Sequence, residues 1–324
     1  MLKIRNILCP TDLAEPSAEA LRYALALART YEAKLHLCHS AESVYATDAA
    51  LSPMTVENMR SLFTNLILKY RGDVDLASID WEGLVIEGSG DPAEGIACAA
   101  AERGVDLIVM RSRRRPYRAA LLGSTAETVC RIAPCPVLVT HSQEREWVGL
   151  ETGEVNLKKI LVAYDFSDDA ERALSLALSL AEEYQSDLHL LHVLLKPAQD
   201  APEIAWGPGS VEGVYHQAAR RLQKAVMGGP YLGRNIKQAV RWGRPYQEVL
   251  SYAKEEHIDL LCMGANGNNF SVEGLFGSNV DRVLRQAPCP VLVAHPLKPT
   301  LMTSELSEPV DHVTTDQPSR VREA

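Results

Sequence analysis

The fold is decided by the stretch Ile258-Asp259-Leu260-Leu261-Cys262-Met263-Gly264-Ala265-Asn266-Gly267, together with Gly277-Ser278-Asn279-Val280 further along the chain. An apolar run opens into two glycines, and nine residues separate Gly267 from Gly277. Glycine lets the backbone approach an anion closely and adopt positive φ, and the N–H groups at a helix start carry partial positive charge. The spacing G-x2-G-x9-G-S therefore predicts a buried strand followed by a phosphate-binding loop and a helix.

Almost everything around this motif occurs twice. The segment Ile7-Leu8-Cys9-Pro10-Thr11-Asp12 recurs as Ile160-Leu161-Val162-Ala163-Tyr164-Asp165, 153 positions later. The segment Ala133-Pro134-Cys135-Pro136-Val137-Leu138-Val139 recurs as residues 287–293, at an offset of 154, so the loop before it is one residue shorter in the first copy. The chain is therefore predicted to contain a duplicated domain whose copies differ in the loop that faces a ligand.

Composition narrows the class of protein. The chain has 324 residues and a net charge of −9, which argues against a general binder of nucleic acid or membrane surfaces. Seven cysteines without a CxxC spacing indicate neither a disulfide framework nor a zinc site. No N-terminal signal and no run of about 18 apolar residues occurs, so we expect a cytoplasmic protein.

Each copy alternates short apolar runs with segments of helical periodicity, which is typical of a parallel sheet flanked by helices. The fold class is therefore predicted as α/β, with two tandem Rossmann-like domains of five parallel strands each. In the second copy the expected strands are 159–164, 187–194, 236–240, 259–263 and 290–294, and three of the expected helices are 211–227, 246–256 and 279–286. Ser167-Asp168-Asp169 are expected to cap the remaining helix, with Glu171 as a capping-box partner.

Asp165 is the candidate ligand-binding carboxylate. In open parallel sheets ligands bind beyond the carboxyl ends of the strands, where the strand order reverses, and the first and fourth strands end at Asp165 and Gly264. A carboxylate repels phosphates, so Asp165 is predicted to accept a hydrogen bond from a base or a ribose. The alternative role is helix capping, for which Ser167 and Asp168 already supply groups.

Both halves resemble the universal stress protein family, as a tandem pair. The resemblance rests on the strand endings Pro10-Thr11-Asp12 and Ala163-Tyr164-Asp165, the repeated Ala-Pro-Cys-Pro-Val-Leu-Val and the G-x2-G-x9-G-S loop. It implies a nucleotide α-hydrolase-like fold with domains at 1–142 and 157–297. Composition itself predicts a polar linker at 143–156 and, because the end of the chain is rich in Pro, Ser, Thr and Glu without periodicity, a disordered tail at 298–324. The resemblance also implies pairing of the two halves through edge strands, and a possible further homodimer.

In this family the glycine loop marks members that bind ATP, so the resemblance implies ATP as the ligand, accompanied by Mg²⁺ or Mn²⁺ on the phosphates. No residue of the sequence reads as a general base or nucleophile aimed at a γ-phosphate, so we expect no catalytic residue and at most very slow hydrolysis. No metal ligand from the protein is predicted. The residues implied in nucleotide binding are Ala163, Tyr164, Asp165, Val193, Met263, Gly264, Ala265, Asn266, Gly267, Gly277, Ser278, Asn279 and Val280.

The first copy departs from the pattern in its loop. Arg111 stands where the second copy has Gly264, and Arg114 stands where it has Gly267. We therefore expect the first domain not to bind ATP in the family's manner. Three alternatives stay open for this loop, which also contains Arg113, Arg115 and Arg118: binding of another anion, pairing with acidic residues such as Asp12, or a solvated surface.

Two competing functions remain. A scaffold could retain the glycine loop without binding a nucleotide, and an adenylylating enzyme of related architecture would use the same fold. Such enzymes carry an SGGxDS-type loop after the first strand, where this chain reads Asp165-Phe166-Ser167-Asp168. The pairs His36/His39 and His189/His192 have a spacing that puts their side chains on opposite faces of a strand, so no metal pair is expected.

Overall fold

The structure is a computed structural model that describes residues 3–40, 56–71, 78–86, 90–112, 124–141, 145–149, 152–195, 210–227, 236–267 and 278–295. Gly277, the predicted tail at 298–324 and the arginines from 113 onward in the first loop lie outside these residues. The first half contains β1 (Asn6–Pro10), α1 (Glu15–Tyr31), β2 (Lys34–Ser40), α2 (Val56–Tyr70), β3 (Trp81–Ile86), α3 (Pro92–Glu102), β4 (Leu107–Arg111), α4 (Ser124–Ile132) and β5 (Val137–Thr140).

The second half repeats this order. It contains β6 (Lys159–Ala163), α5 (Asp168–Tyr184), β7 (Asp187–Leu194), α6 (Val211–Met227), β8 (Ile236–Trp242), α7 (Pro245–Glu255), β9 (Leu260–Gly264), α8 (Ser278–Gln286) and β10 (Val291–Ala294). The strand predicted at 236–240 continues to Trp242, because β8 pairs with β7 along its whole length, up to Leu194 opposite Trp242. The duplication predicted from the sequence is thus a repeat of the same nine elements.

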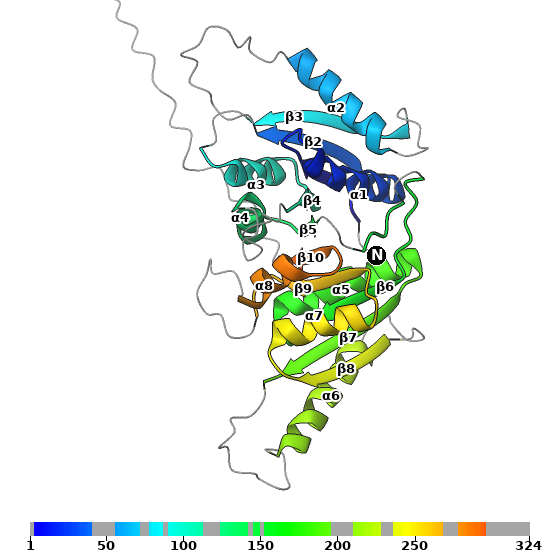
Figure 1. Cartoon of the computed structure of the whole chain (residues 1–324), viewed down its shortest axis with the longest axis vertical. Helices are drawn as coiled ribbons and strands as arrows, with labels where there is room; N and C mark the ends of the chain where they lie inside the picture. Colours follow the sequence, from blue (N-terminus) through cyan, green and yellow to red (C-terminus); the bar gives the residue numbers. More distant parts are fainter. Residues whose placement is uncertain are drawn as a thin grey trace, which may run out of the picture.

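All ten strands form one sheet in the order β3-β2-β1-β4-β5-β10-β9-β6-β7-β8 (Figure 1). Within each half the strands are parallel, and β5 and β10 join the halves by antiparallel pairing, with Leu138 opposite Leu292. The predicted fold class and the predicted pairing of the halves through edge strands are therefore confirmed. In each half the strand order reverses between the first and fourth strands, which is where a crevice opens in such sheets.

Helices cover both faces of the sheet, so the central strands are buried on both sides. On one face α1, α2, α5 and α6 pack over residues such as Ile7 and Ile160. On the other face α3, α4, α7 and α8 pack over residues such as Leu8 and Leu161. This two-sided burial explains why the strands read as continuous apolar runs rather than as alternating patterns.

The segment that joins the halves packs against α1. Trp147 is buried, and its ring meets that of Tyr23 edge to face at a centroid distance of 4.8 Å. The buried guanidinium of Arg22 forms an ion pair with Glu146 at 2.8 Å. Val148 pairs with Val155 as an isolated antiparallel bridge. The linker therefore contributes apolar and ionic contacts to the joint between the halves.

Helix α5 is capped by Ser167, whose Oγ accepts a hydrogen bond from the backbone N–H of Ala170 at 3.2 Å. The expected capping box with Glu171 is wrong, because the helix begins one residue earlier than that pairing requires. The carboxylate of Glu171 instead accepts a hydrogen bond from the hydroxyl of Tyr164. Among the described residues, no helix has the length and apolar character needed to cross a membrane.

Candidate functional site

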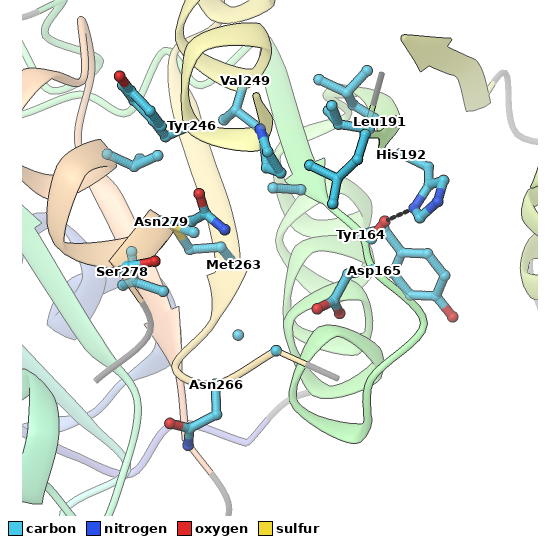
Figure 2. Close-up of a pocket in the computed structure, with 18 residues that line it drawn as sticks. Tyr164, Asp165, Leu191, His192, Tyr246, Val249, Met263, Asn266, Ser278 and Asn279 are labelled. Carbon is cyan, nitrogen blue, oxygen red and sulfur yellow. Dashed lines mark hydrogen bonds between the residues drawn. The ribbon is translucent and has the colours of Figure 1, made fainter. Parts of the chain in front are cut away.

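A cavity of about 400 Å³ opens at the carboxyl ends of β6, β7 and β9, between the starts of α7 and α8 (Figure 2). It lies at the position where the strand order of the second half reverses. The residues that line it are Ala163, Tyr164, Asp165, Leu191, His192, Val193, Leu195, Pro245, Tyr246, Val249, Met263, Gly264, Asn266, Gly267, Ser278, Asn279, Val280 and Val283.

The structure brings together nearly all residues that the sequence placed at the site. Every predicted site residue lines the cavity except Ala265 and Gly277, and Gly277 lies outside the described residues. Ala265 is buried, and its N–H donates a hydrogen bond to the carbonyl oxygen of Ala294 at 2.9 Å. Ala265 therefore extends the pairing between β9 and β10 and does not face the cavity.

Seven further lining residues were not predicted. They come from the end of β7, the start of α7 and the second turn of α8, and they are Leu191, His192, Leu195, Pro245, Tyr246, Val249 and Val283. A signal for part of this set was present in the sequence, because Gly243-Arg244-Pro245, at the start of α7, repeats Gly90-Asp91-Pro92 at the offset of 153 residues. The ring of Tyr246 also lies under the guanidinium of Arg282, whose Cζ is 4.7 Å from the ring centroid.

Close approach explains the two glycines of the loop. A Cβ on Gly264 would lie 2.6 Å from the Cβ of Asp169 and 2.9 Å from the backbone nitrogen of Ala170. A Cβ on Gly267 would lie 2.6 Å from Oδ2 of Asp165. Neither glycine has a positive φ, so the expectation that this loop needs that freedom is wrong for both. The loop needs glycine because it passes directly over α5 and over a carboxylate.

Asp165 is held by the residue that caps α5. Its Oδ1 accepts hydrogen bonds from the backbone N–H of Ser167 at 3.0 Å and from the Ser167 hydroxyl at 2.5 Å. The capping residue is Ser167, so the alternative role of Asp165 as the helix cap does not hold. Figure 2 shows the Asp165 carboxylate on the cavity side, whereas the ring of Tyr164 turns away from it.

Asp169 is a contact residue of the loop that the sequence did not indicate. Its carboxylate is buried, and Oδ2 accepts hydrogen bonds from the backbone N–H of Asn266 at 3.1 Å and from its Nδ2 at 3.2 Å. Oδ1 accepts a hydrogen bond from Arg172 at 2.7 Å. Asn266 therefore directs its donors toward α5, and Figure 2 shows its side chain pointing out of the cavity.

A cluster of rings supports the wall formed by β6 and β7. Nδ1 of His192 lies 2.7 Å from the carbonyl oxygen of Tyr164, and the His192 ring packs against Phe166 at 4.6 Å. The guanidinium of Arg221 lies over the ring of Phe166, with its Cζ 3.8 Å from the ring centroid. Burial lowers the pKa of His192, so at neutral pH the ring is uncharged and donates its Nδ1 proton to Tyr164.

Asp165 is the one carboxylate among the described lining residues, and no lysine or arginine is among them. The chemistry offered to a ligand is therefore an apolar wall, one carboxylate, a hydroxyl at Ser278, an amide at Asn279 and the N-terminus of α8. Within the part of the chain that the structure describes, no three His, Cys, Asp or Glu side chains gather to hold a metal ion.

The equivalent loop of the first half begins differently. Arg111 has an almost fully buried side chain, which forms an ion pair with Glu19 on α1. Of the alternatives for the arginines, the structure shows pairing with an acidic residue at Arg111, and the described partner is Glu19. The remaining arginines lie outside the described residues.

The paired histidines occupy structural positions. His36 contacts Glu82 at 2.8 Å and Asn6 at 3.1 Å, and His189 contacts the hydroxyl of Tyr252 at 3.1 Å. His39 and His192 contact the backbone carbonyl oxygens of Thr11 and Tyr164. Each of the four rings therefore forms hydrogen bonds within its own half of the chain.

Comparison with known proteins assigns both halves to one family. The universal stress protein family matches residues 3–141 and 156–295. The universal stress protein MJ0531 of Methanocaldococcus jannaschii is 30% identical over 146 residues, which cover 44% of this chain and 85% of that protein. The universal stress protein Sll1654 of Synechocystis is 33% identical over 141 residues, covering 44% of this chain and 87% of that protein.

A solved structure matches the whole arrangement. The crystal structure of a universal stress protein from Archaeoglobus fulgidus aligns with 91% of this chain and 99% of its own, with a TM-score of 0.62 and 21% sequence identity. At this identity the likeness concerns the fold, and it extends over both halves. The chain belongs to the universal stress protein family and carries two of the family's domains in tandem.

Proposed function

We propose that the second half of the chain binds ATP in the cavity described above, and that the protein acts in a stress response or in signalling rather than as a fast catalyst. The observation that carries the proposal is the convergence of an apolar wall, a glycine loop and a helix N-terminus in one cavity. A volume of about 400 Å³ falls within the range of small-molecule sites, roughly 300–1,000 Å³.

The apolar wall is suited to the nucleobase. Leu191, Val193 and Val249 contribute apolar side chains to the lining of the cavity, and Tyr246 adds an aromatic ring. Asp165 supplies an acceptor to the cavity, and a nucleoside offers it amino and hydroxyl donors. Because Ser167 fixes the carboxylate with two hydrogen bonds, the acceptor is oriented before a ligand arrives.

The opposite end is suited to phosphates. Helix α8 starts at Ser278, and the first N–H groups of a helix have no partner within the helix. Ser278 and Asn279 both line the cavity there, so phosphate oxygens could accept hydrogen bonds from this helix start.

A divalent cation fits this site as a companion of the phosphates. Mg²⁺ prefers oxygen ligands and is usually bound through one or two carboxylates together with substrate phosphates. Ser278 and Asn279 supply side-chain oxygens at the phosphate end, so we infer that Mg²⁺ or Mn²⁺ enters with ATP, is held mainly by phosphate oxygens and screens their charge. Asp165 is already engaged by Ser167, which favours a role in orientation over proton transfer.

The test is nucleotide content and affinity, with a control supplied by the duplication. The purified chain is denatured and the released nucleotide is quantified, and ATP with Mg²⁺ is titrated calorimetrically into the emptied protein. Asp165→Ala is expected to weaken ATP binding at least roughly tenfold, because it removes the oriented acceptor. Asp12→Ala is the matched control in the first half, where Asp12 accepts the equivalent hydrogen bond from Ala14 at 3.1 Å.

Release of about one ATP per chain supports a single site in the second half. Equal losses from Asp165→Ala and Asp12→Ala would contradict it, and so would release of two nucleotides. Failure of the unmodified chain to bind ATP supports the scaffold function instead. Pyrophosphate release in the presence of a carboxylic acid substrate supports the adenylylating enzyme.

A further inference from the structure

The start of α5 forms a clamp on the glycine loop. Asp169 lies in the first turn of the helix and is only 8% exposed, and its Oδ2 accepts both the main-chain and the side-chain donor of Asn266. Arg172 neutralises the other carboxylate oxygen at 2.7 Å. A buried carboxylate with these three donors is satisfied, so it stabilises the loop position without offering free negative charge to the cavity.

The backbone contact beside this carboxylate is equally close. The absence of a Cβ on Gly264 lets β9 end within contact distance of Asp169 and Ala170. The Ser167 hydroxyl also lies 3.5 Å from the carbonyl oxygen of Asn266. Residues 264–266 are therefore fixed on α5, directly before Gly267, which contacts Asp165 in the cavity.

The duplication provides an internal comparison. At the offset of 153 residues, Asp169 corresponds to Pro16 and Asn266 to Arg113, so the first half has neither partner of these hydrogen bonds. Gly264 corresponds to Arg111, and Arg172 corresponds to Glu19. In the first half, Arg111 and Glu19 form an ion pair with each other. The residues that form the clamp in the second half, on the helix as well as in the loop, are thus all replaced by other residue types in the first half.

We propose that Asp169 is a positioning residue for a phosphate-binding loop, and that it selects nucleotides over nucleosides without touching either. The inference rests on the proposed function of the cavity. Asp169 holds residues 264–266 in one conformation, and these residues directly precede Gly267, which lines the cavity. When a site is formed only part of the time, the apparent affinity falls by the fraction formed. That loss applies to ligands that use the loop, which are those with phosphates.

The experiment compares ATP with adenosine on the full chain, by calorimetric titration in the presence of Mg²⁺. Asp169→Ala is expected to weaken ATP binding roughly tenfold or more, while adenosine affinity changes less than about twofold. Asp168→Ala is the matched control, because it removes the same charge from the same helix turn but has no hydrogen bond to the loop among the described contacts. It is expected to leave both affinities within about twofold.

Asp169→Asn separates the hydrogen bonds from the charge. Its remaining carbonyl oxygen can still accept from Asn266, so ATP affinity is expected to lie closer to that of the unmodified chain than to that of Asp169→Ala. This variant also serves if Asp169→Ala does not fold, as judged by circular dichroism melting. An Asn variant as weak as the Ala variant would overturn positioning by hydrogen bonds.

Two other results would overturn the proposal. One is ATP affinity unchanged by Asp169→Ala, and the other is an equal loss for ATP and adenosine, which indicates a general structural role. If the unmodified chain binds neither ligand, the proposed function is wrong and the clamp is judged by hydrogen exchange. Amide exchange of residues 264–267 is then expected to rise in Asp169→Ala but not in Asp168→Ala, and equal exchange would refute the clamp.

Discussion

Gly267 lies against the carboxylate of Asp165, so closely that a Cβ at position 267 would be 2.6 Å from Oδ2. The atom in the way belongs to a side chain and can move, whereas the Gly264 backbone meets the backbone of α5. The two loop glycines therefore differ in what a substitution would disturb. One affects the acceptor in the cavity, and the other affects the packing of the fold.

Gly267→Ala is expected to weaken ATP binding roughly tenfold while leaving the unfolding midpoint unchanged or slightly raised. The added methyl group displaces the Asp165 carboxylate, and the φ of Gly267 is not positive, so alanine causes no backbone strain. Calorimetry and thermal unfolding measure the two effects. A variant that binds ATP normally would show that the position of this carboxylate is unimportant.

Gly264→Ala is expected to destabilise the protein by about 1–3 kcal/mol, because its Cβ would overlap with backbone atoms that cannot move separately from α5. The measurement is the free energy of unfolding in denaturant. Gly90→Ala is the control, since a Cβ there meets nothing within 4 Å, and it is expected to change stability by less than about 0.5 kcal/mol. Similar losses of unfolding free energy in Gly264→Ala and Gly90→Ala would contradict the packing argument.

Tyr246→Ala is expected to lower ATP affinity roughly tenfold, because stacking of a base on an aromatic ring contributes about 1–3 kcal/mol. The first half has Ala93 at the equivalent position, so the substitution introduces the residue of the half that we expect not to bind ATP. Titration with ATP measures the change. Tyr215→Ala on α6 is the control, because Tyr215 is a partly exposed ring outside the cavity. Unaltered affinity in Tyr246→Ala would exclude a role for this ring.

Stability is expected to fall as the pH drops from about 7.5 to about 5.5. Burial lowers the pKa of His36, His189 and His192, so the unfolded chain takes up these protons first, near pH 6.5, and acidification favours unfolding. Each residue contributes a slope of at most about 1.4 kcal/mol per pH unit. His189→Gln, which can keep a hydrogen bond to Tyr252, is expected to reduce the slope measured by urea unfolding. A slope of the opposite sign would contradict this assignment.

Much of the fold could be predicted because the chain repeats itself. Strands such as 187–194 and helices such as 211–227 agree with β7 and α6, since apolar runs and helical periodicity are local signals. The same signals place Asp165 and Gly264 at neighbouring strand ends. The lining residues at the ends of β6 and β9 and at the start of α8 were therefore foreseeable, whereas most of those at the end of β7 and all of those on α7 were not predicted.

Contacts between distant segments could not be predicted in this way. Asp169 and Asn266 lie 97 positions apart, and in the sequence Asp169 reads only as one more acidic residue at a helix start. The role of Gly264 depends on the distance between β9 and α5, which no local pattern specifies. Trp147 stands in a segment that otherwise reads as a polar linker, and its burial depends on α1. Contacts between side chains of two distant elements cannot be predicted from the periodicity of either element alone.

The antiparallel junction of β5 and β10 lies within a single polypeptide, and this fixes the composition of the assembly. Where two separate subunits meet, each can dissociate and exchange its partner at a rate set by concentration. Here a half with a glycine loop is always joined to a half that carries Arg111 and Glu19, in a one-to-one ratio that dilution does not alter. The two halves are therefore free to diverge, because neither is ever required to pair with a copy of itself.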